Sequence, residues 1–140
     1  MSRLIIVSNR LPFAVDHDGE EIKLRQSSGG LVSAIKSYFE GDHSLEELQE
    51  KLWIGVADFP QEDWDKVSVD QSNVDFEIKP LFVDKETYNG YYNGFSNSVL
   101  WPLFHYFPTL VEYATSYYED YLQINKKFCK ISCSTGQPKR

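Results

Sequence analysis

The chain is poor in the features that mark several large classes of protein. It has two cysteines, one methionine and no apolar run long enough to cross a membrane, and 21 acidic residues outnumber 14 lysines and arginines. The net charge of −7 disfavours non-specific binding to nucleic acid or to an anionic membrane, because both need clustered cations. The apolar run near the N-terminus is too short for a signal peptide. We therefore expect a cytoplasmic protein that binds neither nucleic acid nor membrane.

The spacing of the two cysteines argues against both a redox motif and a zinc site. Cys129 and Cys133 are separated by three residues, which matches neither a redox Cys-x-x-Cys pair nor half of a zinc site. The sequence predicts two free thiols in a reducing compartment, and no metal site. Residues 129–140 show no periodicity and end in basic side chains, so they are predicted to form an unstructured tail.

What the chain does contain is typical of one folded α/β domain. It has 140 residues, of which 41% are hydrophobic and 15% aromatic, enough for a single core. Residues 4–7 and 53–57 are continuous apolar runs, typical of parallel strands buried on both faces, and 76–83 predict a third strand that Pro80 interrupts. A hairpin is predicted between 13–15 and 22–25, with its turn at 16–19.

Two segments sit where α/β folds bind phosphates. Arg10 follows the first strand, and it is either a phosphate or substrate contact or an ordinary surface arginine. Ser27, Ser28, Gly29 and Gly30 precede an amphipathic helix, whose free N–H groups suit a diphosphate. The alternative is that the serines cap that helix and the glycines form a turn.

Helices are predicted to fill most of the second half. Asp84 is expected to cap a helix that runs through Tyr92, and a further helix is expected from Ser96 until Pro102 bends it. A long amphipathic helix is predicted to start at Pro108.

The stretch 91–106 mixes aromatic side chains with amides, serines, a glycine and a histidine. A segment built only for a core would not need that polar set. Ring faces cover the C–H surfaces of a sugar while polar groups bind its hydroxyls, so this stretch predicts a sugar site. Within it, Phe95, Leu100 and Phe104 are expected to pack.

Four segments in this order resemble the N-terminal part of trehalose-6-phosphate synthases. The resemblance covers roughly residues 2–128, about the first quarter of the synthase domain. It rests on Ser8-Asn9-Arg10-Leu11-Pro12, Ser27-Ser28-Gly29-Gly30-Leu31, Trp53-Ile54-Gly55, and Tyr91-Tyr92-Asn93-Gly94-Phe95-Ser96-Asn97 running on to Leu100-Trp101-Pro102-Leu103-Phe104-His105-Tyr106.

The resemblance implies a retaining GT-B glycosyltransferase with two Rossmann-like domains, which moves glucose from UDP-glucose to glucose 6-phosphate. It implies that Arg10, Tyr92 and Trp101 bind glucose 6-phosphate, and that Gly29 and Gly30 form the loop at the donor UDP-glucose. Catalysis would rest on positioning and electrostatics, with no catalytic residue in this chain, no metal and no cofactor. Any protein partner is expected to be a second copy or a full-length synthase.

Two departures qualify the resemblance. Val56 stands where the family usually has a second tryptophan, which predicts a differently shaped acceptor pocket. The rest of the synthase domain does not follow, so we expect residues 1–128 to be a partial N-terminal, acceptor-side domain, truncated and inactive alone. The alternatives are a non-catalytic sugar-phosphate-binding or regulatory subunit and, less favoured for want of Gly-x-Gly-x-x-Gly, a plain nucleotide binder.

Overall fold

We describe the protein from a computed structural model of residues 1–140. It describes residues 3–18, 21–26, 33–34, 37, 50–66 and 77–135. The chain divides into two compact units, Met1–Phe82 and Val83–Arg140, and each is described by itself.

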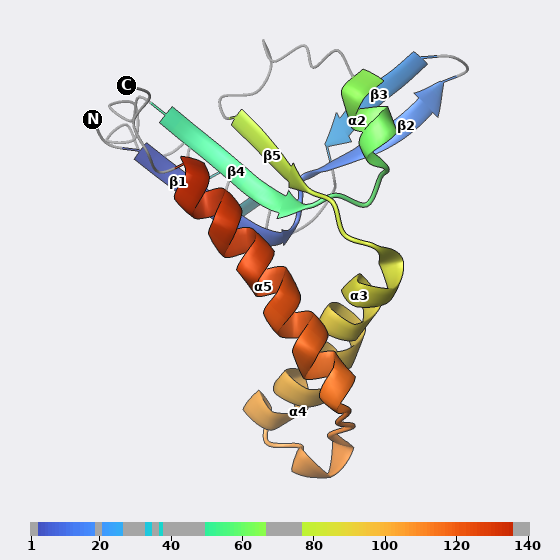
Figure 1. The fold of residues 1–140 in the computed structure, drawn as a ribbon, viewed down its shortest axis with the longest axis vertical. Helices are drawn as coiled ribbons and strands as arrows, with labels where there is room; N and C mark the ends of the chain where they lie inside the picture. Colours follow the sequence, from blue (N-terminus) through green and yellow to red (C-terminus); the bar gives the residue numbers. More distant parts are fainter. Residues whose placement is uncertain are drawn as a thin grey trace. The chain divides into compact units, whose positions relative to one another are not determined.

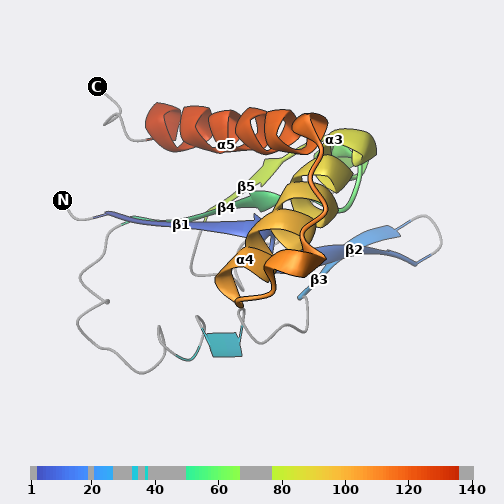
Figure 2. The same ribbon diagram turned by 90° about the horizontal axis from the view of Figure 1, so that it is seen from below.

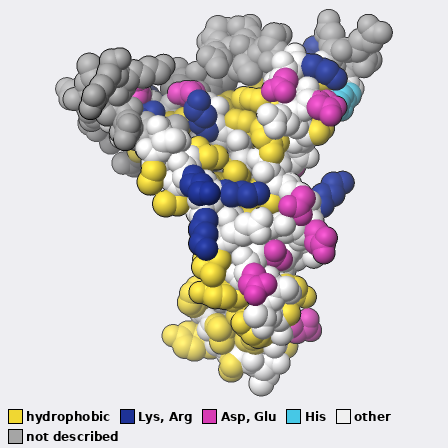
Figure 3. All heavy atoms as spheres, in the orientation of Figure 1, with side chains coloured by type: hydrophobic (Ala, Val, Ile, Leu, Met, Phe, Trp, Pro, Cys, Tyr) yellow, Lys and Arg dark blue, Asp and Glu magenta, His cyan; other side chains and the backbone are white. Residues whose placement is uncertain are grey.

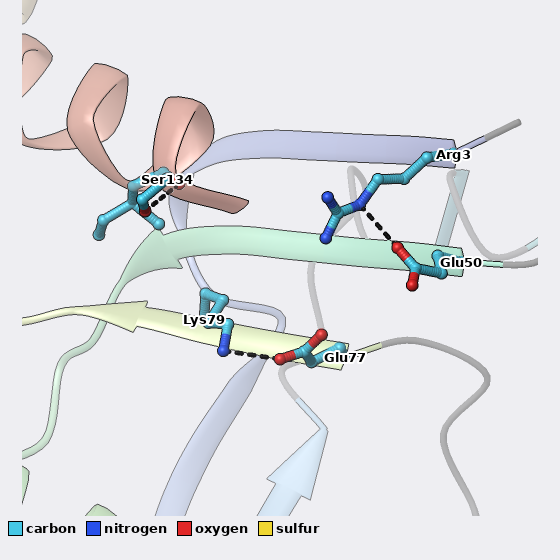
Figure 4. A network of polar contacts seen from close by, with 6 residues as sticks. Arg3, Glu50, Glu77, Lys79 and Ser134 are labelled. Carbon is cyan, nitrogen blue, oxygen red and sulfur yellow. Dashed lines mark hydrogen bonds and ion pairs between the residues drawn. The ribbon is translucent and has the colours of Figure 1, made fainter. Parts of the chain in front are cut away.

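The first unit is built on a parallel sheet (Figure 1). Its strands are β1 (Arg3–Arg10), β4 (Glu50–Val56) and β5 (Glu77–Leu81), in the order β1-β4-β5. Both neighbouring pairs are parallel, as the continuous apolar runs predicted. Ion pairs from Arg3 to Glu50 (3.2 Å) and from Lys79 to Glu77 (2.6 Å) lie on the three strands (Figure 4).

The predicted hairpin is also present, with longer strands than the sequence indicated. β2 (Phe13–Asp18) and β3 (Glu21–Gln26) pair antiparallel from Phe13 with Gln26 to Asp18 with Glu21. The connection is therefore at residues 19–20, and His17 belongs to a strand rather than to the turn. Its Nε2 lies 3.3 Å from Oδ2 of Asp63 in the short helix α2 (Gln61–Lys66).

The core of this unit gathers around one tryptophan. Trp53 is buried with Leu11, Phe59 and Ile78, and Phe59 stacks on Trp64 with ring centroids 5.9 Å apart. Leu52 and Ile54, which alternate with Trp53 along β4, are buried too. β4 is thus apolar on both sides, and this explains its continuous hydrophobic run.

The interruption predicted at Pro80 is wrong. β5 continues through it to Leu81, and Pro80 lies opposite Gly55 in the ladder. A proline is tolerated in a strand where no neighbour needs its N–H, and among the strands that the structure describes β5 pairs with β4 alone.

The second unit is helical (Figure 2). Its elements are α3 (Lys85–Asn89), the π-helix η3 (Gly90–Leu100), α4 (Trp101–Phe104), the 3₁₀ turn η4 (Pro108–Leu110) and α5 (Thr115–Thr135). Asp84 caps α3 as predicted: its Oδ1 accepts the backbone N–H of Thr87 and its Oδ2 accepts the Thr87 hydroxyl, both at 2.8 Å. These hydrogen bonds hold the pKa of Asp84 below its usual value.

Three helix boundaries differ from the prediction. No new helix begins at Ser96, because α3, η3 and α4 follow one another without a break. Pro102 lies inside this continuous run, in α4, and the helix does not end there. The carbonyl oxygen of Ser98, four residues earlier, accepts the N–H of Glu112 at 2.9 Å instead of a proline N–H. Pro108 opens only a single 3₁₀ turn, and the long helix begins at Thr115.

The prediction of an unstructured tail is wrong for residues 129–135, which belong to α5. Ile124, Phe128 and Ile131 are spaced by four and three residues and are buried or half-buried, so the apolar stripe of the helix continues past Phe128. The Ser132 hydroxyl adds a hydrogen bond to the carbonyl oxygen of Phe128 (2.9 Å). Residues 136–140 lie outside the described residues. Within the part of the chain that is described, no helix has the length and apolar character needed to cross a membrane.

Candidate functional site

In the first unit, the candidate site residue Arg10 ends β1 and is exposed. The backbone there is held by a short relay: Trp53 Nε1 donates to Ser8 Oγ (2.8 Å), and Ser8 Oγ donates to the carbonyl oxygen of Arg10 (2.5 Å). The register of β1 against β4 shifts between Ser8 and Arg10. The conformation of the chain at Arg10 is therefore fixed by a buried tryptophan.

Gly55 permits this arrangement. A Cβ at Gly55 would lie 2.6 Å from the backbone nitrogen of Leu11 and 2.7 Å from the carbonyl carbon of Arg10. Only glycine lets the end of β4 come so close to the chain that follows β1. Val56, in the position where a second tryptophan was expected, is buried, and its carbonyl oxygen accepts the N–H of Leu11 at 3.0 Å.

In the second unit, the candidate residue Tyr92 lies in a rare kind of helix, and the candidate residue Trp101 directly follows it as the first residue of α4. π-Helices normally occur as single turns, whereas η3 covers 11 residues. Two serines support its wide ladder, because their hydroxyls donate to carbonyl oxygens five residues earlier, Ser96 to Tyr91 (2.9 Å) and Ser98 to Asn93 (2.8 Å). The N–H of Trp101 also bonds five residues back, to Ser96.

The π-helical ladder decides which side chains share a face. Hydrogen bonds between residues five apart require more than four residues per turn, so the nine steps from Tyr92 to Trp101 correspond to about two turns. In an α-helix the same nine steps would make about two and a half turns and end on the opposite side. We therefore expect Tyr92 and Trp101 to share a face of the continuous helix.

Each of these two rings stacks on a ring four residues away along the chain. Tyr92 stacks on Tyr88, with centroids 5.7 Å apart and planes at 21°, and Trp101 stacks on His105 at 4.1 Å and 18°. His105 Nδ1 lies 2.7 Å from the carbonyl oxygen of Trp101, which only accepts, so Nδ1 carries the proton. The indole is about half exposed, at 49%. His105 was not singled out from the sequence, although its spacing of four residues from Trp101 on a helix was a usable signal.

Other aromatic residues of η3 pack against α5. Tyr91 stacks on Tyr121 at 5.7 Å, and Phe95, which was expected to pack, lies 5.3 Å from Tyr118 and 4.8 Å from Tyr121. Burial, followed by the neighbouring tyrosines, raises the pKa of Tyr91. Gly90 and Gly94 make room for this packing, since a Cβ at either would collide with Asp120 or Tyr117 of α5.

The expectation that Phe104 packs is wrong, because its side chain is 75% exposed. It belongs to a set of exposed apolar side chains that Figure 3 shows gathered at the α4 end of the second unit. We call this set the apolar tip: Leu103, Phe104, Tyr106, Phe107, Leu110 and Tyr113. Tyr106 has a positive φ of 63°, which is uncommon for a residue other than glycine.

The remaining candidates, Gly29 and Gly30, lie outside the described residues, as does most of the helix predicted after them. Arg10 belongs to the first unit, whereas Tyr92 and Trp101 belong to the second.

Comparison with known proteins agrees with the motifs. The sequence profile of glycosyltransferase family 20 matches residues 2–138, nearly the whole chain. The chain belongs to glycosyltransferase family 20.

The relatives of this chain in the family are named as trehalose-phosphate synthases. The chain is 35% identical over 138 residues to the bifunctional trehalose-6-phosphate synthase/phosphatase of Thermoproteus tenax, covering 97% of this chain and 18% of that protein. It is 37% identical over 131 residues to the UDP-forming α,α-trehalose-phosphate synthase of Schizosaccharomyces pombe, covering 91% and 24%. The chain thus spans about a fifth to a quarter of the length of these relatives.

Solved structures of the family have the same fold. The apo structure of OtsA superposes with a TM-score of 0.63 at 27% identity, covering 97% of this chain and 26% of that chain. A trehalose-6-phosphate synthase structure from Burkholderia vietnamiensis gives a TM-score of 0.61 at 23% identity. These likenesses confirm the expected fold. It is part of a GT-B glycosyltransferase, with a mostly parallel sheet and a separate hairpin.

Proposed function

We propose that this chain is the acceptor-side part of a UDP-forming α,α-trehalose-phosphate synthase, which transfers glucose from UDP-glucose to glucose 6-phosphate in the cytoplasm. Membership of glycosyltransferase family 20 and the names of its relatives support the reaction. The observation that supports the proposal in the structure is the π-helical register of η3, whose hydrogen bond from the Trp101 N–H to Ser96 spans five residues and which is expected to bring Tyr92 and Trp101 to a common face. Residues 1–128 would form part of the acceptor-side Rossmann-like domain.

In this proposal Tyr92 and Trp101 bind the hexose of glucose 6-phosphate. An indole that is 49% exposed offers a flat apolar surface to the C–H groups of a sugar, and a phenol adds a hydroxyl. His105 stacks behind the indole and limits its rotation. With Nδ1 directed at the carbonyl oxygen of Trp101, Nε2 is the ring nitrogen left for a hydrogen bond with substrate.

Arg10 would bind the phosphate of the same substrate. A guanidinium pairs with a phosphate through two parallel hydrogen bonds, which gives both charge and direction. The relay from Trp53 through Ser8 to the Arg10 backbone would hold this residue in place. Gly29 and Gly30 would lie at the diphosphate and glucose of UDP-glucose.

Catalysis would depend on positioning and electrostatic stabilisation, with no nucleophile from this chain. Because half of the substrate cleft of a GT-B enzyme comes from a second domain, we expect the 140-residue chain to show no turnover. A coupled assay for UDP release from UDP-glucose and glucose 6-phosphate tests this, and measurable turnover would contradict it.

Calorimetric titration with glucose 6-phosphate tests the binding proposal directly. We expect Arg10→Ala to weaken binding about tenfold to a hundredfold, the range of a hydrogen bond to a charged group. Arg25→Ala is the matched control, because Arg25 is an exposed arginine paired with Asp16 in the hairpin of the same unit. Affinity that is unchanged in Arg10→Ala, or lost equally in both variants, would remove Arg10 from the site.

A second candidate function is a non-catalytic, sugar-phosphate-binding subunit that associates with a second copy or a full-length synthase. Binding without catalysis would need only the candidate sugar-phosphate residues Arg10, Tyr92 and Trp101, all of which lie in this chain. Co-elution with a full-length synthase in gel filtration, together with a change in the synthase KM for glucose 6-phosphate, would support it. Separate elution and an unchanged KM would exclude it.

A further inference from the structure

Helix α5 brings the two cysteines of the chain together. Because the helix continues to Thr135, Cys129 and Cys133 are one turn apart on the same face, and their sulfur atoms are 3.9 Å from each other. Both residues are exposed and both thiols are free. The spacing of three intervening residues indicates no site in an unstructured tail, but in a helix it places two thiols side by side.

A disulfide between them would distort the helix. Residues four apart in an α-helix have Cβ atoms about 5–6 Å apart, whereas a disulfide requires about 3.5–4.5 Å. Closing that gap would need a shift of the backbone in the middle of a continuous helix. The pair is therefore better suited to an atom that bridges the two sulfurs than to a direct bond.

The observed separation matches the spacing of thiolates on a metal ion. Two sulfurs, each about 2.3 Å from a tetrahedral zinc ion, lie about 3.8 Å apart. The pair needs only small side-chain rotations to reach that arrangement, since the sulfurs are 3.9 Å apart already. Thiolates are the ligands that select soft and borderline-soft ions.

The surroundings favour the same kind of ligand. From Ile124 to Thr135 the sequence has no aspartate or glutamate, so no carboxylate recruits a hard ion such as calcium or magnesium. Among the described residues no third His, Cys, Asp or Glu joins the pair, so the two thiols would be the only protein ligands of a bound ion.

We propose that Cys129 and Cys133 form a two-thiolate binding site for a thiophilic divalent metal ion of the zinc and cadmium type. Binding displaces the two thiol protons to solvent and forms two metal–sulfur bonds, while water fills the other coordination positions. The bridge joins successive turns of α5 and stabilises the end of the helix. This site is independent of the proposed sugar-phosphate site.

Titration of the reduced chain with cadmium chloride tests the proposal, with the ultraviolet thiolate-to-cadmium charge-transfer band as the readout. We expect one ion per chain, a slower amide hydrogen exchange over residues 130–135, and competition by zinc. Cys133→Ser and Cys129→Ser should each weaken binding at least tenfold.

The matched control is the double variant Cys133→Ser with Ser134→Cys, which keeps two cysteines but moves one around the helix. Five residues in an α-helix turn through about 140°, so its two sulfurs do not converge. We expect it to bind as weakly as the single variants. Equal affinity for the wild-type and moved-cysteine chains, or one ion per two chains, would overturn the proposal.

Discussion

At the scale of single residues, Gly90 and Gly94 of η3 matter because neither carries a Cβ atom, which would collide with α5. Gly94 faces Tyr117 of α5, and a Cβ there would lie 2.6 Å from Cγ and Cδ1 of that ring. We expect Gly94→Ala to destabilise the second unit by about 1–3 kcal/mol, the cost of overpacking a formed contact, even though alanine is the better helix former. Urea unfolding measures the difference.

The control for that variant is Asn97→Ala, an exposed position of the same helix. It adds the helix propensity of alanine without the collision, so it should leave stability unchanged or raise it slightly. A Gly94→Ala chain as stable as Asn97→Ala would show that α5 and η3 do not pack as closely as described.

Tyr91 gives the second unit a dependence on alkaline pH. Its pKa is raised, chiefly by burial, so the unfolded chain loses the phenol proton first as pH rises. Unfolding is then favoured increasingly from about pH 10, the usual tyrosine value, up to the higher pKa of the folded state. We expect thermal stability to fall less steeply above pH 10 in Tyr91→Phe than in the wild type, and Tyr113→Phe, an exposed tyrosine, to serve as the control. Identical alkaline profiles for Tyr91→Phe and the wild type would contradict this.

At the scale of elements, the π-helical register of η3 rests in part on two hydroxyl groups. Ser96 and Ser98 bond to carbonyl oxygens five residues back, a distance that fits a π-helix and not an α-helix. We expect the double variant Ser96→Ala, Ser98→Ala to shift towards α-helical hydrogen bonding and to turn Trp101 away from Tyr92. NMR couplings across hydrogen bonds measure this, because the Trp101 amide should change its acceptor from Ser96 to Asn97.

The threonine variants at both serines keep the hydroxyl groups and provide the control. We expect the threonine variants to keep the hydrogen bond from the Trp101 N–H to Ser96 and to bind glucose 6-phosphate as the wild type does. If the alanine double variant kept the same acceptor, the serines would have no part in setting the register.

The elements show what could be predicted from the sequence and why. β4 was predictable because a strand buried on both faces needs an unbroken apolar run, as in Leu52, Trp53 and Ile54. The apolar run of β1 also marked a strand, but the expected burial on both faces is wrong there, since Val7 is 50% exposed. The π-helix was not predicted. Gly90 and Gly94 within it lie against α5, and contacts with a later segment of the chain cannot be read from a local pattern. The end of α5 was missed although Ile124, Phe128 and Ile131 carried its period.

The candidate site was predictable in part. Arg10, Tyr92 and Trp101 came from motifs, and the structure adds contacts between motif residues that the motifs alone did not reveal. Ser8 was quoted only as a motif letter, yet its hydroxyl links Trp53 to the backbone of Arg10. Such relays join residues 45 positions apart, so they follow from the fold and not from local pattern.

At the scale of the whole molecule, the apolar tip is a cluster of exposed apolar side chains among the described residues. Phe104 is 75% exposed and Leu110 60%, and exposed apolar patches favour association. We expect concentration-dependent self-association in sedimentation velocity. The double variant Phe104→Ser, Leu110→Ser should raise the concentration needed by about tenfold or more, given the free energy of burying such side chains.

Leu122→Ser supplies the comparison, because Leu122 is an exposed leucine of α5 outside the apolar tip. It should leave association unchanged. If Leu122→Ser and the double variant weakened self-association equally, the apolar tip would not be the contact surface. The same would follow if the wild-type chain stayed monomeric at every concentration.

The fluorescence of the three tryptophans can report on the two units separately. Trp53 and Trp64 belong to the first unit, with Trp53 only 2% exposed, and Trp101 is the single tryptophan of the second unit, 49% exposed. Buried indoles emit at shorter wavelengths than hydrated ones, so the blue edge of the emission spectrum reports on Trp53 in β4 and the red edge on Trp101 in α4. A sugar phosphate that covers Trp101 would shift only the red component, and denaturant would reveal from one spectrum whether the two units melt together.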